Sequence, residues 1–257
     1  MKKGLLIVSF GTTHIDTRKK TIDKIEEISR ENFSQDYEIK IAYTSSIVRK
    51  RVKQNENKEI YSPEEAVLKF KEEGIKELYV LTTHFMNGHE YNKLSHAIMK
   101  ERNNFEKIKI TRPILTSTED LKKIAKFIIS LYELKEYEAL VLMGHGSDHH
   151  SNTVYGATEK IIEDYSNKNI IIGTVEGYPD IETVIKRLNK KNIKKVYLKP
   201  FMLVAGDHAK NDMSGEEEDS WKNILEKEGF EVVIDMKPMG EYEEVQKMYM
   251  EHLKNII

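Results

Sequence analysis

The chain has 257 residues, a formal net charge of −2 at pH 7, 33% charged residues and 39% hydrophobic residues. The balanced charge argues against nucleic-acid binding driven by phosphate neutralisation, and the apolar content excludes a disordered chain. Cysteine is absent, which excludes disulfides, thiolate nucleophiles, iron–sulfur clusters and cysteine zinc sites, so any metal must be held by His, Asp, Glu, other oxygen donors or Met.

The first apolar run of the chain ends too early for a secretion signal. Lys2-Lys3 precede it, but the run stops at Phe10 and Gly11, and no small-residue cleavage pattern follows. A buried first strand is the better interpretation. No apolar stretch approaches the roughly 18 residues of a membrane span, so we expect no membrane association and a cytoplasmic enzyme, with a cytosolic scaffold as the alternative.

Strand-like and helix-like patterns alternate along the first half. The apolar run 4–10 predicts a buried parallel strand, and further strands are predicted at 37–44, 78–82 and within 108–114. Isoleucines at helical spacing predict a helix over 16–30. Ser62-Pro63-Glu64-Glu65 is a strong helix start, and this helix is expected to end near Gly74.

The second half repeats this alternation. Strands are predicted at 139–143, 170–175, 196–198 and 232–234, and helices at 152–165, 180–189, 212–228 and 242–256. The βαβα order predicts an α/β protein in which parallel sheets are covered by helices on both faces.

A weak internal repeat supports two similar halves. At a constant offset of 118 residues, Ile75-Lys76 matches Ile193-Lys194, Tyr79 matches Tyr197, and Glu90 falls on His208. Matches at this level can also arise from shared α/β sequence patterns alone. We predict two lobes, 1–117 and 118–240, with a cleft between them and with the C-terminal helix 241–257 packing on the first lobe.

Three polar residues follow successive predicted strands in the second half. His145 lies between Gly144 and Gly146, and Glu176 and His208 follow at intervals of 31 and 32 residues. About 30 residues make one βαβ unit, so each residue falls just past the carboxyl end of a neighbouring strand, where α/β sheets bind ligands. Two imidazoles and a carboxylate suit Co²⁺, Fe²⁺, Ni²⁺ or Zn²⁺. Taken singly, either histidine could be an ordinary loop residue, and Glu176 could cap a helix.

Other polar clusters allow two interpretations. The segment 83–91 is either a cleft wall or an ordinary loop, and His149-His150 is better explained as a polar loop than as a metal pair. Glu216–Asp219 is expected to form the solvated first turns of a helix. The basic run 49–53 is either a solvated face or a contact for an anionic ligand. The phosphate-binding GxxxxGK[ST], dinucleotide-binding GxGxxG and acyl-transfer GxSxG motifs are missing, so no nucleotide cofactor is expected.

Over essentially its whole length, the sequence resembles the anaerobic sirohydrochlorin cobaltochelatases, which belong to the ATP-independent class II chelatases. The segment from Pro200 to Met213 carries the longest and most specific part of the resemblance. The other marks are Ser9-Phe10-Gly11-Thr12, Asn87-Gly88-x-Glu90-Tyr91, Gly144-His145-Gly146 with His149-His150, Val175-Glu176-x-Tyr178-Pro179 and Asp219-Ser220-Trp221.

The resemblance implies two lobes around a tetrapyrrole cleft and a metal held by His145, Glu176 and His208, the three positions that the spacing also selects. It implies insertion of Co²⁺ into sirohydrochlorin without ATP, in anaerobic cobalamin biosynthesis. We expect catalytic roles for His145 and Glu90. Candidate substrate-binding residues are His89, Glu90, Arg49 and Arg51. Gly177 replaces the serine expected in some relatives, and Ser147-Asp148 also departs from the pattern.

Three alternative functions share the same ligands. One is ferrochelation of sirohydrochlorin for sirohaem, because the donor set accepts Fe²⁺ as well as Co²⁺. A second is a non-catalytic carrier of metal or tetrapyrrole. A third is a metal-dependent hydrolase that activates water. The sequence leaves homo-oligomerisation open.

Overall fold

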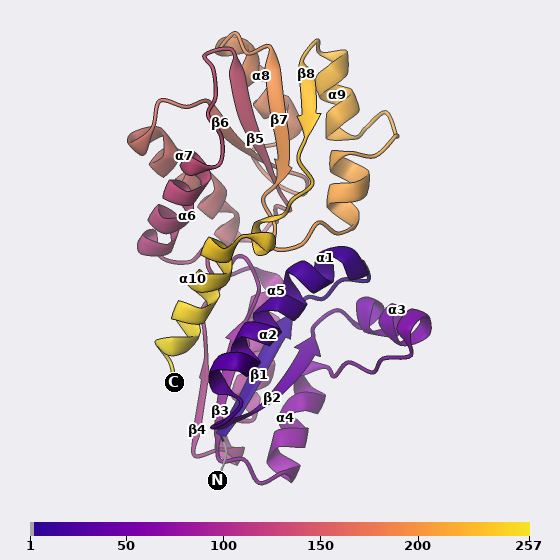
Figure 1. Cartoon of the computed structure of the whole chain (residues 1–257), viewed down its shortest axis with the longest axis vertical. Coiled ribbons are helices and arrows are strands. Elements are labelled where there is room, and N and C mark those ends of the chain that lie inside the picture. The colour runs from indigo at the N-terminus through magenta and orange to yellow at the C-terminus, as the bar shows by residue number, and fades with distance from the viewer. Residues whose placement is uncertain (1–2) are drawn as a thin grey trace. The chain divides into compact units, whose positions relative to one another are not determined.

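The computed structural model describes residues 3–257, which form two compact units (Figure 1). The first unit runs to Ile114 and also includes Glu243–Ile257, and the second unit is Leu115–Tyr242. Within the described range, no helix combines the length and apolar character needed to cross a bilayer.

The first unit is a four-stranded parallel sheet in the order β2-β1-β3-β4. Its strands are β1 (Lys3–Ser9), β2 (Tyr37–Tyr43), β3 (Glu77–Thr82) and β4 (Lys107–Ile110). Its helices are α1 (Ile15–Lys20), α2 (Ile22–Phe33), α3 (Ser46–Glu56), α4 (Pro63–Glu72), α5 (His89–Lys100), the short 3₁₀ helix η1 (Arg102–Asn104) and α10 (Glu243–Lys254).

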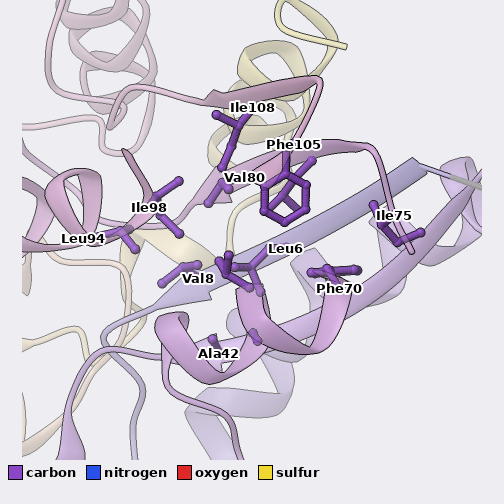
Figure 2. Packing of buried hydrophobic residues seen from close by; sticks show 13 residues of the cluster. Leu6, Val8, Ala42, Phe70, Ile75, Val80, Leu94, Ile98, Phe105 and Ile108 are labelled. Atoms are coloured by element: carbon purple, nitrogen blue, oxygen red, sulfur yellow. The ribbon is translucent and has the colours of Figure 1, made fainter. Parts of the chain in front are cut away.

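Helices cover both faces of this sheet. Leu6 and Val8 of β1 are fully buried against Phe70 of α4, and Leu94 and Ile98 of α5 join the same cluster (Figure 2). On the other face α2 packs against β2, and α10 packs against β3 and α2. Burial on both faces explains why β1 reads as a continuous apolar run rather than an alternating one.

Helix α10 is fixed to the first unit by specific hydrogen bonds as well as by packing. The buried Tyr249 hydroxyl donates to the carbonyl of Thr83 at 3.0 Å. The Nδ1 atom of His252 lies 3.0 Å from the carbonyl of Arg112. The chain therefore returns to its first unit after completing the second.

The second unit is built on a four-stranded parallel sheet in the order β6-β5-β7-β8. Helices α8 and α9 cover the face that carries Val141 and Met143, and α6 and α7 lie on the other side (Figure 1). The strands are β5 (Glu138–Gly144), β6 (Ile170–Thr174), β7 (Lys195–Pro200) and β8 (Glu231–Ile234). The helices are α6 (Thr118–Ser130), α7 (Thr153–Tyr165), α8 (Ile181–Lys190), α9 (Trp221–Lys227), the 3₁₀ helices η2 (His150–Asn152) and η4 (Met239–Glu241), and the π-helix η3 (Ala209–Met213).

Both units have the same strand order, and the 118-residue offset holds residue for residue between α4 and α8. Helices α4 and α8 begin and end at matching positions, and each is capped by a side chain, Ser62 in α4 and Asp180 in α8. Both helices are followed by a residue with positive φ, Gly74 at +73° and Asn192 at +54°. The predicted α/β class with two similar halves is therefore confirmed, and the repeat extends to backbone conformation.

Two predicted helices differ from the structure. The helix expected at 16–30 is divided into α1 and α2 at Thr21, whose hydroxyl donates to the carbonyl of Thr17 at 2.6 Å and whose ψ of −87° is not helical. The helix expected at 212–228 is also wrong. Only α9 is α-helical there, because η3 ends at Met213 and bends and a turn at Glu216–Asp219 precede the α9 cap at Ser220.

Candidate metal site

The three candidate ligands follow three neighbouring strands of the second sheet. His145 comes directly after β5, Glu176 comes two residues after β6, and His208 is the N-cap residue of η3, which follows β7. The pairing of β5 with β6 continues beyond both strands, since the amide of Glu176 donates to the carbonyl of His145 at 2.8 Å. This bond holds the backbones of His145 and Glu176 side by side at the carboxyl edge of the sheet.

The side chains of His145, Glu176 and His208, hereafter the trio, converge. One donor atom from each lies within 4.8 Å of the others. The Nδ1 atom of His145 is 3.6 Å from the Glu176 carboxylate, and the two imidazole centroids are 4.4 Å apart at 76°. The side chains are 46%, 57% and 33% exposed, so an ion can reach them from solvent. The convergence predicted from spacing is confirmed, while metal binding by the trio stays a prediction.

Hydrogen bonds at Nδ1 orient both imidazoles. The Nδ1 atom of His145 lies 3.0 Å from the carbonyl of Gly146, which can only accept, and in the tautomer that donates this hydrogen bond Nε2 is the basic nitrogen. The Nδ1 atom of His208 lies 2.5 Å from the carboxylate of Asp212, one turn along η3. A carboxylate behind a histidine fixes the ring and raises its basicity as a metal ligand. Asp212 was not among the residues predicted from the sequence, although the His-x-x-x-Asp spacing from His208 could have indicated it.

Residues 3–257 match the family described as Cobalt chelatase (CbiK). The chain belongs to this family. It is 31% identical over 254 residues to the sirohydrochlorin cobaltochelatase of Salmonella typhimurium, covering 98% of this chain and 96% of that protein. It is 28% identical over 256 residues to the sirohydrochlorin cobaltochelatase CbiKC of Nitratidesulfovibrio vulgaris, covering 98% and 89%.

Solved chelatase structures share the fold of this CbiK family member. SirB from Bacillus subtilis, described with Fe³⁺, has a TM-score of 0.67 at 14% identity, with 100% of this chain and 96% of that chain covered. CbiX, described as the terminal enzyme of siroheme biosynthesis in denitrifying bacteria, has a TM-score of 0.56 at 15% identity, with both chains fully covered. At these identities the likeness concerns the fold alone.

Gly146 allows the loop after β5 to lie against the loop after β6. Its φ is +83°, and a Cβ atom there would lie 2.8 Å from the amide nitrogen of Gly177 and 2.8 Å from the Cβ atom of Thr174. The first unit has a glycine of the same conformation, Gly11 at +93°, at the matching position after β1. The conformation of the loop after the first strand is therefore repeated in both units, whereas the side chains of the trio are not.

Among the described residues of the first unit, no set is equivalent to the trio. Its counterparts follow from the strand registers, since Ser9 pairs with Tyr43 as Gly144 pairs with Thr174, and Val8 pairs with Thr82 as Met143 pairs with Pro200. The residues that match the trio in this way are Phe10, Ser45 and Glu90. Only the carboxylate of Glu90 is a metal donor of the predicted kind, so the donor set belongs to the second unit.

The remaining candidates lie on helices of the first unit that the sequence patterns did not predict. His89 and Glu90 form the first turn of α5, where Glu90 pairs with Lys93 at 2.9 Å. Arg49 and Arg51 lie on α3, and Arg49 approaches Glu65 at 3.5 Å. Their roles toward a substrate stay predictions.

The histidine pair at 149–150 belongs to a local loop. The Nδ1 atom of His149 accepts a hydrogen bond from the amide of Ser151 at 3.2 Å and caps η2. That nitrogen is therefore occupied within the loop, which agrees with the interpretation of this pair as a polar loop.

His84 follows β3 and stays neutral in the folded chain. Its Nδ1 atom is 2.7 Å from the hydroxyl of Thr82, and its buried Nε2 has no hydrogen-bond partner among the described residues. Burial lowers its pKa from 6.5 to about 4. The unfolded chain therefore binds a proton that the folded chain does not bind between these two values.

This difference predicts a loss of stability in acid. The contribution of His84 is fully present above pH 6.5 and is lost as the pH falls toward 4, by up to about 3 kcal/mol in the free energy of unfolding. Denaturant unfolding across this range should show a flatter pH profile for His84→Gln. The exposed neighbour provides the control, because His89→Gln should keep the full acid loss. If the free energy of unfolding of His84→Gln fell with pH as steeply as that of the unmodified protein, His84 would not be the source of the acid loss.

Proposed function

We propose that this protein inserts Co²⁺ into sirohydrochlorin without ATP. The observation that carries the proposal is the trio itself, in which two oriented imidazoles and a carboxylate converge at an exposed sheet edge of a cobalt chelatase family member. The two relatives matched over nearly their full length are both named sirohydrochlorin cobaltochelatase. Cytoplasmic location stays part of this proposal.

The donor set suits transfer of an ion better than its retention. Three protein ligands leave coordination positions open, and about half of each side chain of His145 and Glu176 faces solvent. The open positions would allow nitrogens of the macrocycle to replace protein ligands one at a time. The charge of Glu176 favours a divalent cation, and the mixed nitrogen and oxygen donors suit Co²⁺.

Metal insertion releases two protons from the pyrrole nitrogens as the ion forms its bonds to the ring. We assign one of these protons to His145, whose basic Nε2 becomes available when the ion leaves it. Glu90 is our candidate for the second proton, or for positioning the substrate. The substrate is a polycarboxylate, so the cationic side chains of Arg49 and Arg51, together with His89, are proposed to bind its periphery.

The test is incubation of purified protein with sirohydrochlorin and Co²⁺, with no nucleotide, followed by absorbance of the macrocycle. We expect catalytic turnover above the spontaneous rate. Stoichiometric binding without metallation would instead indicate a carrier, and strict dependence on nucleotide would contradict ATP independence. A parallel assay with Fe²⁺ distinguishes ferrochelation, because the donor set accepts both ions.

Asp212 should matter for metal affinity although it is not one of the trio. Asp212→Ala removes the carboxylate behind His208, and loss of such a partner weakens metal binding by about 10- to 100-fold. Asp212→Asn keeps an acceptor for Nδ1 and should lose less. Calorimetric titration with Co²⁺ measures both variants.

The matched control for Asp212 is another aspartate in an i,i+4 pair. Asp164→Ala breaks the exposed pair of Asp164 with Lys160 on α7 and should leave Co²⁺ affinity unchanged. Equal affinities of Asp212→Ala and the unmodified protein would remove Asp212 from the site.

A further inference from the structure

We propose that Asn152 is a positioning residue that sets the separation of His145 and Glu176. This inference deepens the proposed function and rests on it. Asn152 is the last residue of η2 and comes immediately before α7. It is not one of the trio. It touches both loops that carry these two ligands.

The side chain of Asn152 bridges the two loops with its two ends. Its Oδ1 accepts a hydrogen bond from the amide of Ser147 at 3.0 Å, two residues after His145. Its Nδ2 donates to the carbonyl of Tyr178 at 2.6 Å, two residues after Glu176. The side-chain amide of Asn152 thus connects the backbone that follows His145 to the backbone that follows Glu176.

Asn152 can transmit position because its own backbone is held. Its amide donates to the carbonyl of His149 at 2.9 Å, and the next residue opens α7. The loop before it is closed by His149, whose Nδ1 lies 2.9 Å from the hydroxyl of Ser151. The side chain therefore extends from a fixed base and not from a mobile segment.

Gly177 provides the space that the bridge needs. A Cβ atom at position 177 would lie 2.8 Å from Oδ1 of Asn152 and 3.1 Å from the amide nitrogen of Ser147. Any larger residue would push against the same hydrogen bond. Gly177 and Asn152 thus form one arrangement. Position 177 should not vary independently of position 152.

The bridge acts on geometry and not on charge. The amide is neutral, and its contacts are to backbone groups that flank the ligands. Without it, one bond remains between the ligand backbones themselves, from the amide of Glu176 to the carbonyl of His145 at 2.8 Å. Loss of the bridge should therefore loosen the metal site without unfolding the sheet edge. A shift of even a few tenths of an ångström matters for a donor set that must meet one ion.

The experiment measures Co²⁺ affinity by calorimetry, and the geometry of the bound ion by its visible absorption, in the absence of macrocycle. Asn152→Ala should weaken Co²⁺ binding by about 10-fold, the range typical of outer-shell partners, and alter the visible spectrum. The matched control is Asn169→Ala at the opposite end of the same sheet, where Nδ2 of Asn169 donates to the carbonyl of Glu136 at 2.9 Å. That variant can lower the melting temperature but should leave affinity and spectrum unchanged.

A double-mutant cycle tests the coupling to Gly177. As a single substitution, Gly177→Ala should weaken Co²⁺ binding. In the Asn152→Ala background the same substitution should weaken binding far less, because the Oδ1 atom that the new Cβ would contact is gone. The inference would be overturned if Asn152→Ala left the Co²⁺ affinity and the spectrum unchanged. It would also be overturned if the losses in Co²⁺ binding free energy of the two single variants added up to that of the double variant. The proposed function fails by a separate result, namely an unmodified protein that binds Co²⁺ but does not metallate sirohydrochlorin.

Discussion

His145→Ala and His208→Ala should each abolish Co²⁺ insertion while leaving the protein folded. Each change removes one of three donors, and the remaining two cannot hold the ion against water. We expect Co²⁺ affinity to fall by more than about 100-fold, beyond what loss of an outer-shell partner costs. The side chains are 46% and 33% exposed, so their loss leaves no large buried void.

Calorimetry with Co²⁺, the metallation assay and thermal unfolding measure these effects separately. His150→Ala is the control, because His150 is an exposed histidine of the neighbouring loop that lies outside the trio. It should keep both affinity and turnover. Full activity in either His145→Ala or His208→Ala would remove that residue from the mechanism.

Asp235→Ala should cause a large loss of stability in the second unit. The side chain of Lys199, on β7, is completely buried, and its ammonium donates to the Asp235 carboxylate at 2.7 Å and to the carbonyl of Lys237 at 2.6 Å. The hydroxyl of Tyr132 donates to the same carboxylate. Removing the carboxylate leaves a buried cation without its counter-charge, which costs about 3–5 kcal/mol in the free energy of unfolding.

The same two segments provide a matched control for Asp235. Lys195 and Glu231 form an ion pair of the same length, 2.7 Å, between β7 and β8, but Glu231 is 66% exposed. Glu231→Ala should cost less than about 1 kcal/mol. Denaturant unfolding measures both variants, and a small loss in Asp235→Ala would show that Lys199 finds another partner or loses its proton. Replacing Lys199 and Asp235 together with apolar residues should restore most of the lost stability.

The sequence predicts the strands of both sheets well because β1 and β5 are apolar runs that end in turn residues, and the other strands alternate with recognisable helix patterns. It also predicts the convergence of the trio, since one βαβ unit between successive ligands leaves little choice of location. The location of the three ligands depends only on the topology of the sheet, so it is predicted correctly although the ends of several elements differ from their predicted limits.

Helices α3 and α5 were harder to predict from the sequence. Only one residue of α3 is buried, Val52, so its apolar pattern is too sparse to read. Helix α5 begins after Gly88 without a side-chain cap, and its polar first turn reads as a loop. The break at Thr21 depends on a hydrogen bond within the helix that composition does not reveal.

The contacts that support the trio could not be predicted from the sequence in the same way as the strands. Asp212 and Asn152 act through hydrogen bonds whose partners are a side chain in one case and backbone groups of two loops in the other. Residue type alone does not separate them from other polar residues, although the spacing of Asp212 from His208 is a usable signal. The pairing of Lys199 with Asp235 is equally invisible, because it depends on which face of β7 the lysine occupies.

The shared backbone plan of the two units has an evolutionary consequence. One scaffold appears twice in the chain, with the same strand order and with glycines of like conformation after the first strand of each copy. The trio comes together in one copy, and the positions that match its imidazoles carry Phe10 and Glu90 in the other. This asymmetry is what duplication followed by divergence of the two halves produces, and the proposed coordination of an ion would constrain the side chains of the second half alone.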